Sequence, residues 1–349
     1  MPPPEFKSDT KIMKPLPDTT RFGGIWIPLV TPFTERGANL DLPAVQRLAH
    51  YYVEAGVAGL VVCGTTGEAA TLSPGEQDHL LATVLKTVDG RCRVMMGVAG
   101  ADTEAMARRV QQFDHYDLAG LLSSPPAYVK PSQAGILAHY QKLAAATRHP
   151  IILYNIPSRT GVNLEPSTVA QLAAGGHFPA LKESTGNIPQ LINLIETAAL
   201  EVLSGDDSLL LVTLLLGGTG GICACAHVRP DLFVALVKMV KQGRIADAQA
   251  LSRQLQPLIG LLFSEPNPAP VKAMLALQGL IGDALRLPMM PVSAASRQLL
   301  ADELRRIAAI KLPQQVQLAA RTAVLRRGVS GSRIREAVLC PGHNGTISV

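Results

Sequence analysis

Aromatic residues are scarce in this chain, where Phe, Trp and Tyr make up 4% of 349 residues and tryptophan occurs once. The hydrophobic core must therefore consist mainly of aliphatic side chains, since hydrophobic residues still account for 47% of the sequence. A chain of this length and composition can fill one large core or two smaller ones. We therefore expect a globular protein with an aliphatic interior.

The body of the chain also lacks a surplus of positive charge. Of the formal net charge of +5, the stretch Pro313–Val349 carries +4, because it contains five arginines and one acid. The other 312 residues have a net charge of +1, which is too little for a surface that follows nucleic-acid phosphates. We predict no nucleic-acid partner and a small, locally neutral substrate.

Paired cysteines and targeting segments are missing as well. The five cysteines are an odd number, and the spacing of Cys223 and Cys225 is too short for a zinc knuckle. The N-terminus has no apolar core of a signal peptide. The apolar stretch Ser208–Ala226 approaches the length of a membrane span, but glycines interrupt it between Gly217 and Gly221. We predict reduced thiols, no membrane span and a cytoplasmic protein.

Short apolar runs recur along the chain and start about every 28 residues, the period of a strand–helix unit. They are continuously apolar rather than alternating, as expected for parallel strands buried on both faces. The eight runs are Ile25–Val30, Gly59–Cys63, Arg93–Val98, Gly120–Ser123, Ile151–Asn155, Ala180–Lys182, Glu201–Ser204 and Gly221–Ala224.

Helix-like segments lie between and after these runs. Apolar residues at helical spacing, or a helix-start signature, predict helices at Leu42–Ala55, after Ser73-Pro74-x-Glu76, at Pro131–Ala146 and at Pro166–Ala174. After Arg229 the pattern predicts helices only, at Asp231–Gln242, Ile245–Phe263, Ala269–Gly279 and Ala294–Ile310.

Eight strand–helix units of similar length close most economically into a (β/α)8 barrel. A doubly wound sheet is the alternative, but no G-x-G-x-x-G sequence follows the first strand. We therefore predict an α/β protein with a (β/α)8 barrel at residues 23–230 and a small all-helical C-terminal domain at 231–312. Residues 1–22 are expected to be an N-terminal extension, and residues 313–349 a flexible basic tail.

Polar residues at the C-terminal ends of barrel strands are the candidates for catalysis. Lys182 directly follows Ala180 and Leu181, so its side chain should start at the mouth of an apolar barrel. Poor hydration there favours the neutral amine, which can attack a carbonyl. A lysine that reaches out to solvent, or one that pairs with Glu183, is the simpler alternative.

Tyr154 ends the preceding strand and should face Lys182. Its phenol can transfer protons if a hydroxyl such as that of Thr65 orients it. A core tyrosine whose hydroxyl is already hydrogen-bonded is equally compatible with the sequence.

The run Gly64–Gly67 offers backbone N–H groups and the hydroxyls of Thr65 and Thr66 to a carboxylate. The alternative is a simple turn between strand and helix. Arg159 suits a second carboxylate, or lies on the surface.

Asp206 and Asp207 are potential metal ligands, but no further ligands stand near them at a suitable spacing. We interpret both as loop or capping residues and predict no metal.

Five segments resemble, in order and spacing, the dihydrodipicolinate synthase/N-acetylneuraminate lyase family of class I aldolases. The resemblance covers roughly residues 23–310 and includes GTTGE, YNIPSRTG, LKESTGN, SGDD and EPNPAPVK, which begin at Gly64, Tyr154, Leu181, Ser204 and Glu265. Thr65-Thr66 and Arg159 resemble the synthases more than the lyases.

The resemblance implies a role for each matching residue. Lys182 would form an imine with pyruvate, Tyr154 would transfer protons, and Thr65 would link Tyr154 to Tyr128. Thr65 and Thr66 would hold the pyruvate carboxylate. The remaining substrate-binding residues would be Arg159, for the carboxylate of aspartate semialdehyde, and Gly205 and Ile222, which would line the pocket.

The resemblance also bears on assembly and regulation. In the family the residue matching Tyr128 enters a neighbouring subunit's site, which implies a homo-oligomer, commonly a tetramer of two tight dimers. No cofactor is implied, because the iminium is the electron sink. Many bacterial members are inhibited by lysine, but the matching positions here carry Pro74, Gln77, Ala101, Ala105 and Ala127. We predict weak or absent lysine inhibition.

The first hypothesis is a lyase that condenses pyruvate with aspartate semialdehyde, a step toward diaminopimelate and lysine. A paralogue acting on a sugar acid or another 2-oxo acid through the same imine is the second, because Cys223-Ala224-Cys225-Ala226 is less polar than the matching stretch of the synthases. A barrel that binds ligands without catalysis is the third, and it is disfavoured because Lys182, Tyr154, Thr65 and Arg159 are all present.

Overall fold

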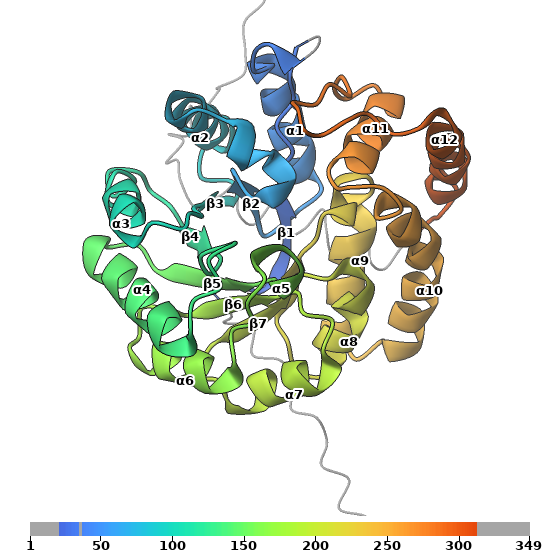
Figure 1. The fold of residues 1–349 in the computed structure, drawn as a ribbon. Helices are drawn as coiled ribbons and strands as arrows, with labels where there is room; N and C mark the ends of the chain where they lie inside the picture. The colour runs from blue at the N-terminus through green and yellow to red at the C-terminus, as the bar shows by residue number, and fades with distance from the viewer. Residues whose placement is uncertain (1–20, 35–36, 313–349) are drawn as a thin grey trace, which may run out of the picture. The chain divides into compact units, whose positions relative to one another are not determined.

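The computed structural model describes residues 21–34 and 37–312. Eight parallel strands follow one another around a closed barrel in the order of the sequence, and β1 pairs with both β2 and β8 (Figure 1). The strands are β1 Gly24–Pro28, β2 Gly59–Val62, β3 Arg93–Gly97, β4 Gly120–Ser123, β5 Ile151–Asn155, β6 Ala180–Glu183, β7 Glu201–Ser204 and β8 Gly220–Ile222. The closure excludes a doubly wound sheet and confirms the predicted barrel.

Helices follow the strands and surround them (Figure 1). The α-helices are α1 Leu42–Glu54, α2 Pro74–Val88, α3 Thr103–Gln111, α4 Gln133–Ala146, α5 Pro157–Thr160, α6 Pro166–Ala174, α7 Ile188–Thr197, α8 Leu210–Leu215, α9 Pro230–Lys241, α10 Ile245–Leu262, α11 Ala269–Leu277 and α12 Ala294–Ala308. Short 3-10 turns lie at η2 Thr65–Gly67, η3 Ala69–Thr71, η4 Asp207–Leu209 and η5 Cys225–His227.

Side-chain caps hold the predicted starts of α1 and α2. Asp41 accepts a hydrogen bond from Ala44 N at the start of α1. At the start of α2, the Ser73 hydroxyl accepts from Glu76 N while the Glu76 carboxylate accepts from Ser73 N. Such reciprocal caps satisfy backbone N–H groups that have no partner inside the helix. The signature read from the sequence is therefore a true helix start.

The last strand differs from its prediction, because β8 ends at Ile222 rather than at Ala224. The carboxylate of Asp207 accepts hydrogen bonds from Ala224 N at 3.2 Å and Cys225 N at 2.7 Å. These two N–H groups therefore bond to a side chain from the loop after β7, and the chain turns into η5. This contact joins residues 17 and 18 positions apart through a polar side chain, so the apolar pattern did not show it.

The apolar stretch Ser208–Ala226 forms part of η4, then α8, β8 and part of η5. Across residues 21–34 and 37–312, no helix combines the length and apolar character needed to cross a membrane. The four cysteines in the described chain, Cys63, Cys92, Cys223 and Cys225, are buried free thiols, as predicted.

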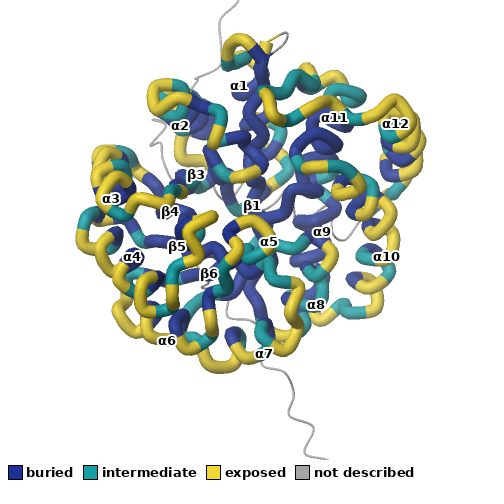
Figure 2. Tube along the Cα trace, in the orientation of Figure 1, coloured by how far each residue is buried: buried dark blue, intermediate teal, exposed yellow. Residues whose placement is uncertain are grey.

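The barrel interior is mostly aliphatic, and near its N-terminal end Phe22 and Trp26 pack against each other. Trp26 Nε1 donates to Phe22 O at 2.7 Å, and the carboxylate of Glu201 accepts from Phe22 N. Phe22 was assigned to the N-terminal extension, but its fully buried side chain belongs to this core. The strands are buried along their length, whereas exposed residues gather on loops and outer helix faces (Figure 2).

The C-terminal helices form a further layer beside the barrel (Figure 1). α9 packs against β1 and thus covers the barrel itself, while α10 packs against α9 and α12, and α11 against α12. The predicted boundary between residues 230 and 231 stays a prediction. Residues 1–20 and the predicted tail 313–349 lie outside the described residues.

Candidate active site

Lys182 and Tyr154 are neighbours at the C-terminal ends of β6 and β5. The parallel register pairs Tyr154 with Lys182 directly, and Lys182 Nζ lies 4.2 Å from the centroid of the Tyr154 ring. The two residues are only 7% and 8% exposed. Lys182 therefore does not extend into solvent, and the face-to-face arrangement predicted from the sequence is present.

The side chain of Glu183 points away from Lys182 because successive strand residues face opposite sides. Its carboxylate accepts hydrogen bonds from Asn155 Nδ2 at 3.1 Å and from Thr185 N at 2.9 Å. Burial raises the pKa of the Glu183 carboxyl, and these hydrogen bonds partly oppose the rise. Glu183 is therefore engaged outside the barrel, and it does not form the ion pair with Lys182 that the sequence left open.

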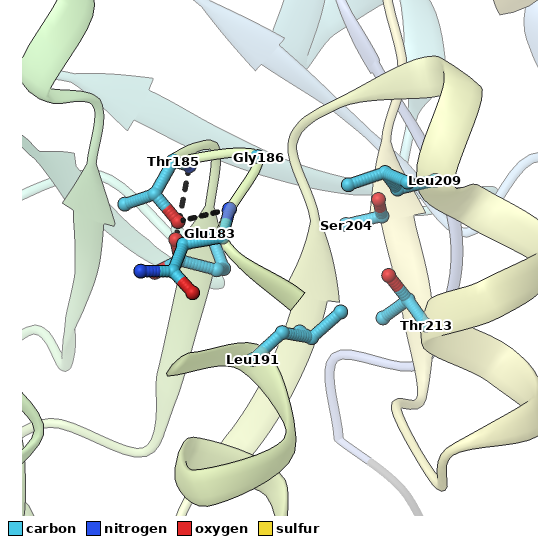
Figure 3. A pocket seen from close by; sticks show the side chains of 8 residues that line it. Glu183, Thr185, Gly186, Leu191, Ser204, Leu209 and Thr213 are labelled. Atoms are coloured by element: carbon cyan, nitrogen blue, oxygen red, sulfur yellow. Dashed lines mark hydrogen bonds between the residues drawn. The ribbon is translucent and has the colours of Figure 1, made fainter. Parts of the chain in front are cut away.

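Figure 3 shows the small cavity on that outer side, between β6, β7, α7 and α8. Side chains of Glu183, Ser204, Leu191 and Thr213 contribute to its lining, and its volume is about 10 Å³. This is room for a water molecule at most. The cavity therefore does not compete with the barrel mouth as a substrate site.

Gly205 makes room for the Lys182 side chain. A Cβ atom at position 205 would lie 2.8 Å from both Cγ and Cε of Lys182, and it would collide with Ser184 Oγ. Contacts this short are not tolerated in folded proteins, so any other residue would force these side chains to move. Gly205 thus leaves the space that the Lys182 side chain occupies.

Ser184 is a site residue to which we assigned no role from the sequence. It follows Lys182 by two positions on β6 and the loop after it, so both side chains face the same side. Its Oγ atom is buried and has no hydrogen-bond partner within residues 21–34 and 37–312. The signal available in the sequence was the two-residue spacing from Lys182.

Asp206 and Asp207 have structural contacts, as predicted. Asp206 caps η4 by accepting from Ser208 N at 3.0 Å. Asp207 is buried, and burial raises the pKa of its carboxyl to about 6, against the opposing effects of its hydrogen bonds and of Lys182. In the part of the chain that the structure describes, no cluster of three or more His, Cys, Asp or Glu side chains could hold a metal ion.

The loop after β2 brings Thr66 and Glu68 into contact with the C-terminal helical segment. Thr66 is buried, and its Oγ1 atom accepts a hydrogen bond from Asn267 Nδ2 at 2.9 Å. Glu68, whose backbone is left-handed with φ of 53°, forms a buried ion pair with Lys272 at 2.5 Å. Thr65 is exposed, and no hydrogen bond joins it to Tyr154 in the described chain.

The other predicted site residues come from β8 and from the segments after β4 and β5. Ile222 is part of the same interior cluster as Tyr154. Arg159, on α5, is exposed, and its guanidinium forms no hydrogen bond or ion pair with another described residue. Tyr128 is 93% exposed and has a left-handed backbone with φ of 73°. Within one chain, the predicted link from Thr65 to Tyr128 is not formed.

A buried lysine beside a tyrosine at the C-terminal mouth of a (β/α)8 barrel is the arrangement of a class I aldolase, which reacts through an imine. Residues 21–307 match the model of the Dihydrodipicolinate synthetase family. The 4-hydroxy-tetrahydrodipicolinate synthase of Anaeromyxobacter sp. (strain K) is 40% identical over 279 residues, which cover 79% of this chain and 94% of that protein. The chain belongs to the Dihydrodipicolinate synthetase family.

Solved structures agree with this assignment. The dihydrodipicolinate synthase of Thermotoga maritima superposes with a TM-score of 0.81 at 35% identity, covering 83% of this chain and all of that one. An enzyme of the same name from Cyanidioschyzon merolae, solved with lysine bound, has a TM-score of 0.80 at 34% identity and covers 83% of this chain and 99% of its own. The family's barrel is therefore the fold of this chain.

Proposed function

We propose that this protein is a lyase that condenses pyruvate with L-aspartate 4-semialdehyde to give 4-hydroxy-tetrahydrodipicolinate, a step toward diaminopimelate and lysine. The observation that carries the proposal is the buried Lys182 beside Tyr154 at the barrel mouth. The names of the relatives support this substrate pair over a sugar acid.

The reaction begins when the neutral amine of Lys182 attacks the carbonyl carbon of pyruvate. Uptake of one proton and loss of water give a protonated imine, which draws electrons from the pyruvate methyl group. The methyl carbon then loses a proton, and the resulting enamine attacks the aldehyde carbon to form the new C–C bond. The amino group of the adduct finally displaces Lys182 from the imine carbon, which closes the ring and frees the lysine.

The surrounding residues bind the substrates and move protons. Tyr154 carries protons during imine formation, because its ring already lies against Lys182. Thr65 and Thr66 hold the pyruvate carboxylate, and Arg159 offers its unpaired guanidinium to the carboxylate of the aldehyde. No metal or other cofactor takes part, because the iminium itself accepts the electrons.

Borohydride reduction in the presence of pyruvate tests the imine. We expect a stable mass gain on the peptide that contains Lys182, and no gain in a Lys182→Arg variant. Absence of the adduct from the wild-type protein would contradict both enzymatic hypotheses. A coupled assay with aspartate semialdehyde against a panel of sugar acids then tests the second substrate, and a higher kcat/KM for a sugar acid would contradict the proposed reaction.

We also propose a homo-oligomer, built as a tetramer of tight dimers, in which Tyr128 completes the site of a neighbouring subunit. The support is its exposure, since Tyr128 is 93% exposed and its hydroxyl forms no hydrogen bond with another described residue of its own chain. Lys182→Ala and Tyr128→Phe variants are expected to be nearly inactive alone. When the two variants are mixed and reassembled, activity should return. In a mixed oligomer, the site of the Tyr128→Phe subunit keeps its own Lys182 and receives Tyr128 from the Lys182→Ala subunit. No recovery in verified mixed oligomers would contradict the exchange.

A further inference from the structure

One hydrogen bond connects the C-terminal helical segment to the candidate active site. Asn267 Nδ2 donates to Thr66 Oγ1 at 2.9 Å, across a separation of 201 residues. Asn267 lies two residues before α11, whereas Thr66 lies in η2 at the C-terminal end of β2. The two residues therefore meet only because the segment folds back over the barrel mouth.

The direction of this hydrogen bond determines what the Thr66 hydroxyl can do. A hydroxyl has one proton to donate, and its lone pairs accept. Since Thr66 Oγ1 accepts from Asn267, its proton stays available, and no hydrogen bond donated by Thr66 occurs among residues 21–34 and 37–312. The hydroxyl of Thr31 differs from that of Thr66 in this respect, because it donates to Gly67 O at 2.6 Å and so has no proton left for a ligand.

Buried charges hold the two partners in place. Lys272, in the first turn of α11, forms a 2.5 Å ion pair with Glu68, and both side chains are almost fully buried. Glu68 also accepts from Arg286 N at 3.1 Å. Breaking a buried pair leaves an uncompensated charge, so these contacts resist displacement. The amide of Asn267 therefore keeps a fixed position relative to Thr66.

We propose that Asn267 is a positioning residue that orients the Thr66 hydroxyl, so that its proton points to the carboxylate of the 2-oxo acid bound at Lys182. This inference rests on the proposed function, in which Thr66 holds that carboxylate. Asn267 itself does not touch the substrate. Its effect passes through Thr66 and appears in the binding of pyruvate rather than in the chemical steps.

The test is a double-mutant cycle on the kinetics of the full-length enzyme. Asn267→Ala is expected to raise the KM for pyruvate about tenfold, the typical value of one hydrogen bond to a charged group, with little change in kcat. Thr66→Val removes the hydroxyl at nearly constant volume and should raise the same KM at least as much. In the Thr66→Val background, Asn267→Ala should then have no further effect, because the two residues act as one unit.

Gln278→Ala is the matched control. Gln278 ends the same segment, its Nε2 donates to Val228 O at 3.0 Å, and its Oε1, like Asn267 Oδ1, is buried without a partner among the described residues. This variant should lose comparable stability while keeping the KM for pyruvate. Asn267→Asp is a second variant of nearly native volume. It can only accept from Thr66, so it should raise this KM more than alanine does.

Several outcomes would overturn the inference. These are an unchanged KM for pyruvate in Asn267→Ala or Asn267→Asp, additive effects in the cycle, or the same rise in KM in Gln278→Ala. The pyruvate concentration for half-maximal borohydride trapping gives a second readout, which should rise in Asn267→Ala. If the wild-type protein forms no adduct at all, the proposed function fails. If the wild type forms it and Asn267→Ala traps at the same concentration, only the role of Asn267 fails.

Discussion

Lys182 Nζ lies 4.2 Å from the centroid of the Tyr154 ring, with both residues buried at the ends of adjacent strands. The ring packs against the amine end of the Lys182 side chain, so this contact holds the lysine in position. The phenolic hydroxyl stands at the edge of the same ring. The tyrosine can therefore position the amine and exchange protons at the atom where the imine forms.

The first prediction separates these two effects. Tyr154→Phe keeps the ring but removes the hydroxyl, so Lys182 should stay in place while proton transfer is lost. We expect kcat to fall about a hundredfold, in the range of general acid–base catalysis. Borohydride trapping with pyruvate should still modify Lys182, but more slowly, as measured by mass spectrometry over time.

Tyr140→Phe is the matched control, because Tyr140 is also buried and its hydroxyl donates to Ser123 O at 2.9 Å. It should lose about 1 kcal/mol of stability, as is typical of one hydrogen bond, and keep its kcat. Equal losses of kcat in the two variants would show that Tyr154 acts only through packing.

A second prediction concerns the space beside the lysine. In Gly205→Ala the new methyl group would lie 2.8 Å from Cγ and Cε of Lys182, so the side chain must move. Small misplacements of reacting groups are costly, and we expect kcat to fall at least about tenfold in the coupled assay. Circular dichroism should show a retained fold.

Gly260→Ala provides the comparison, since position 260 lies within α10 and a Cβ atom there meets nothing within 4 Å. This change should leave kcat unaltered and stabilise the helix by about 0.5–1 kcal/mol. Wild-type activity in Gly205→Ala would mean that Lys182 does not need its observed position.

The fold was largely predictable because the barrel follows from local patterns. Continuous apolar runs define strands buried on both faces, and Glu201–Ser204 begins and ends as predicted. The pairing of Tyr154 with Lys182 followed from their places at the ends of neighbouring strands. The end of β8 was not predictable in this way. The N–H groups of Ala224 and Cys225, which follow the strand, donate to the side chain of Asp207 from the loop after β7.

The parts of the site that escaped prediction depend on contacts between distant segments. Nothing in the sequence near Asn267 indicates that its amide meets Thr66, 201 residues away. The apolar pattern of the sequence likewise does not indicate that Tyr128 is 93% exposed. Ser184 was visible at its spacing from Lys182, but only the structure shows its buried, unpaired hydroxyl.

Weak or absent inhibition by lysine is the third prediction. Gln77 is the polar side chain among the positions that match the family's inhibitory site, and its amide already forms hydrogen bonds within the chain. Nε2 donates to Ala69 O at 3.2 Å and to Leu72 O at 3.4 Å, while Oε1 accepts from Arg109 Nη2 at 3.0 Å. Binding lysine would require breaking these hydrogen bonds.

Initial rates should therefore change little as lysine is added, and lysine should raise the melting temperature little or not at all. The melting temperature in the presence of pyruvate serves as the positive control, because a ligand that binds the folded state raises it. Half-maximal inhibition at sub-millimolar lysine would contradict this prediction.

The last prediction concerns acid stability and His227, which is fully buried. Its Nε2 accepts from Val30 N at 3.1 Å and its Nδ1 lies 2.7 Å from Ala224 O, an arrangement that fits the neutral ring with a proton on Nδ1. Burial lowers the pKa of His227 from 6.5 to about 4, and the bond to Ala224 opposes the shift. Between these values the unfolded chain binds the proton better, so the folded state loses stability as the pH falls.

Asp207 changes the pH dependence of stability in the opposite direction to His227, because burial raises the pKa of its carboxyl from 3.8 to about 6. In that window the folded state binds the proton better, so Asp207 adds stability as the pH falls. A comparison of wild type with His227→Gln isolates the histidine, since both proteins keep Asp207. As the pH falls from 6.5 to 4, wild type should lose up to about 3 kcal/mol of unfolding free energy relative to the variant. Denaturant titrations across this range measure the difference, and a constant difference would show that His227 does not titrate as its burial requires.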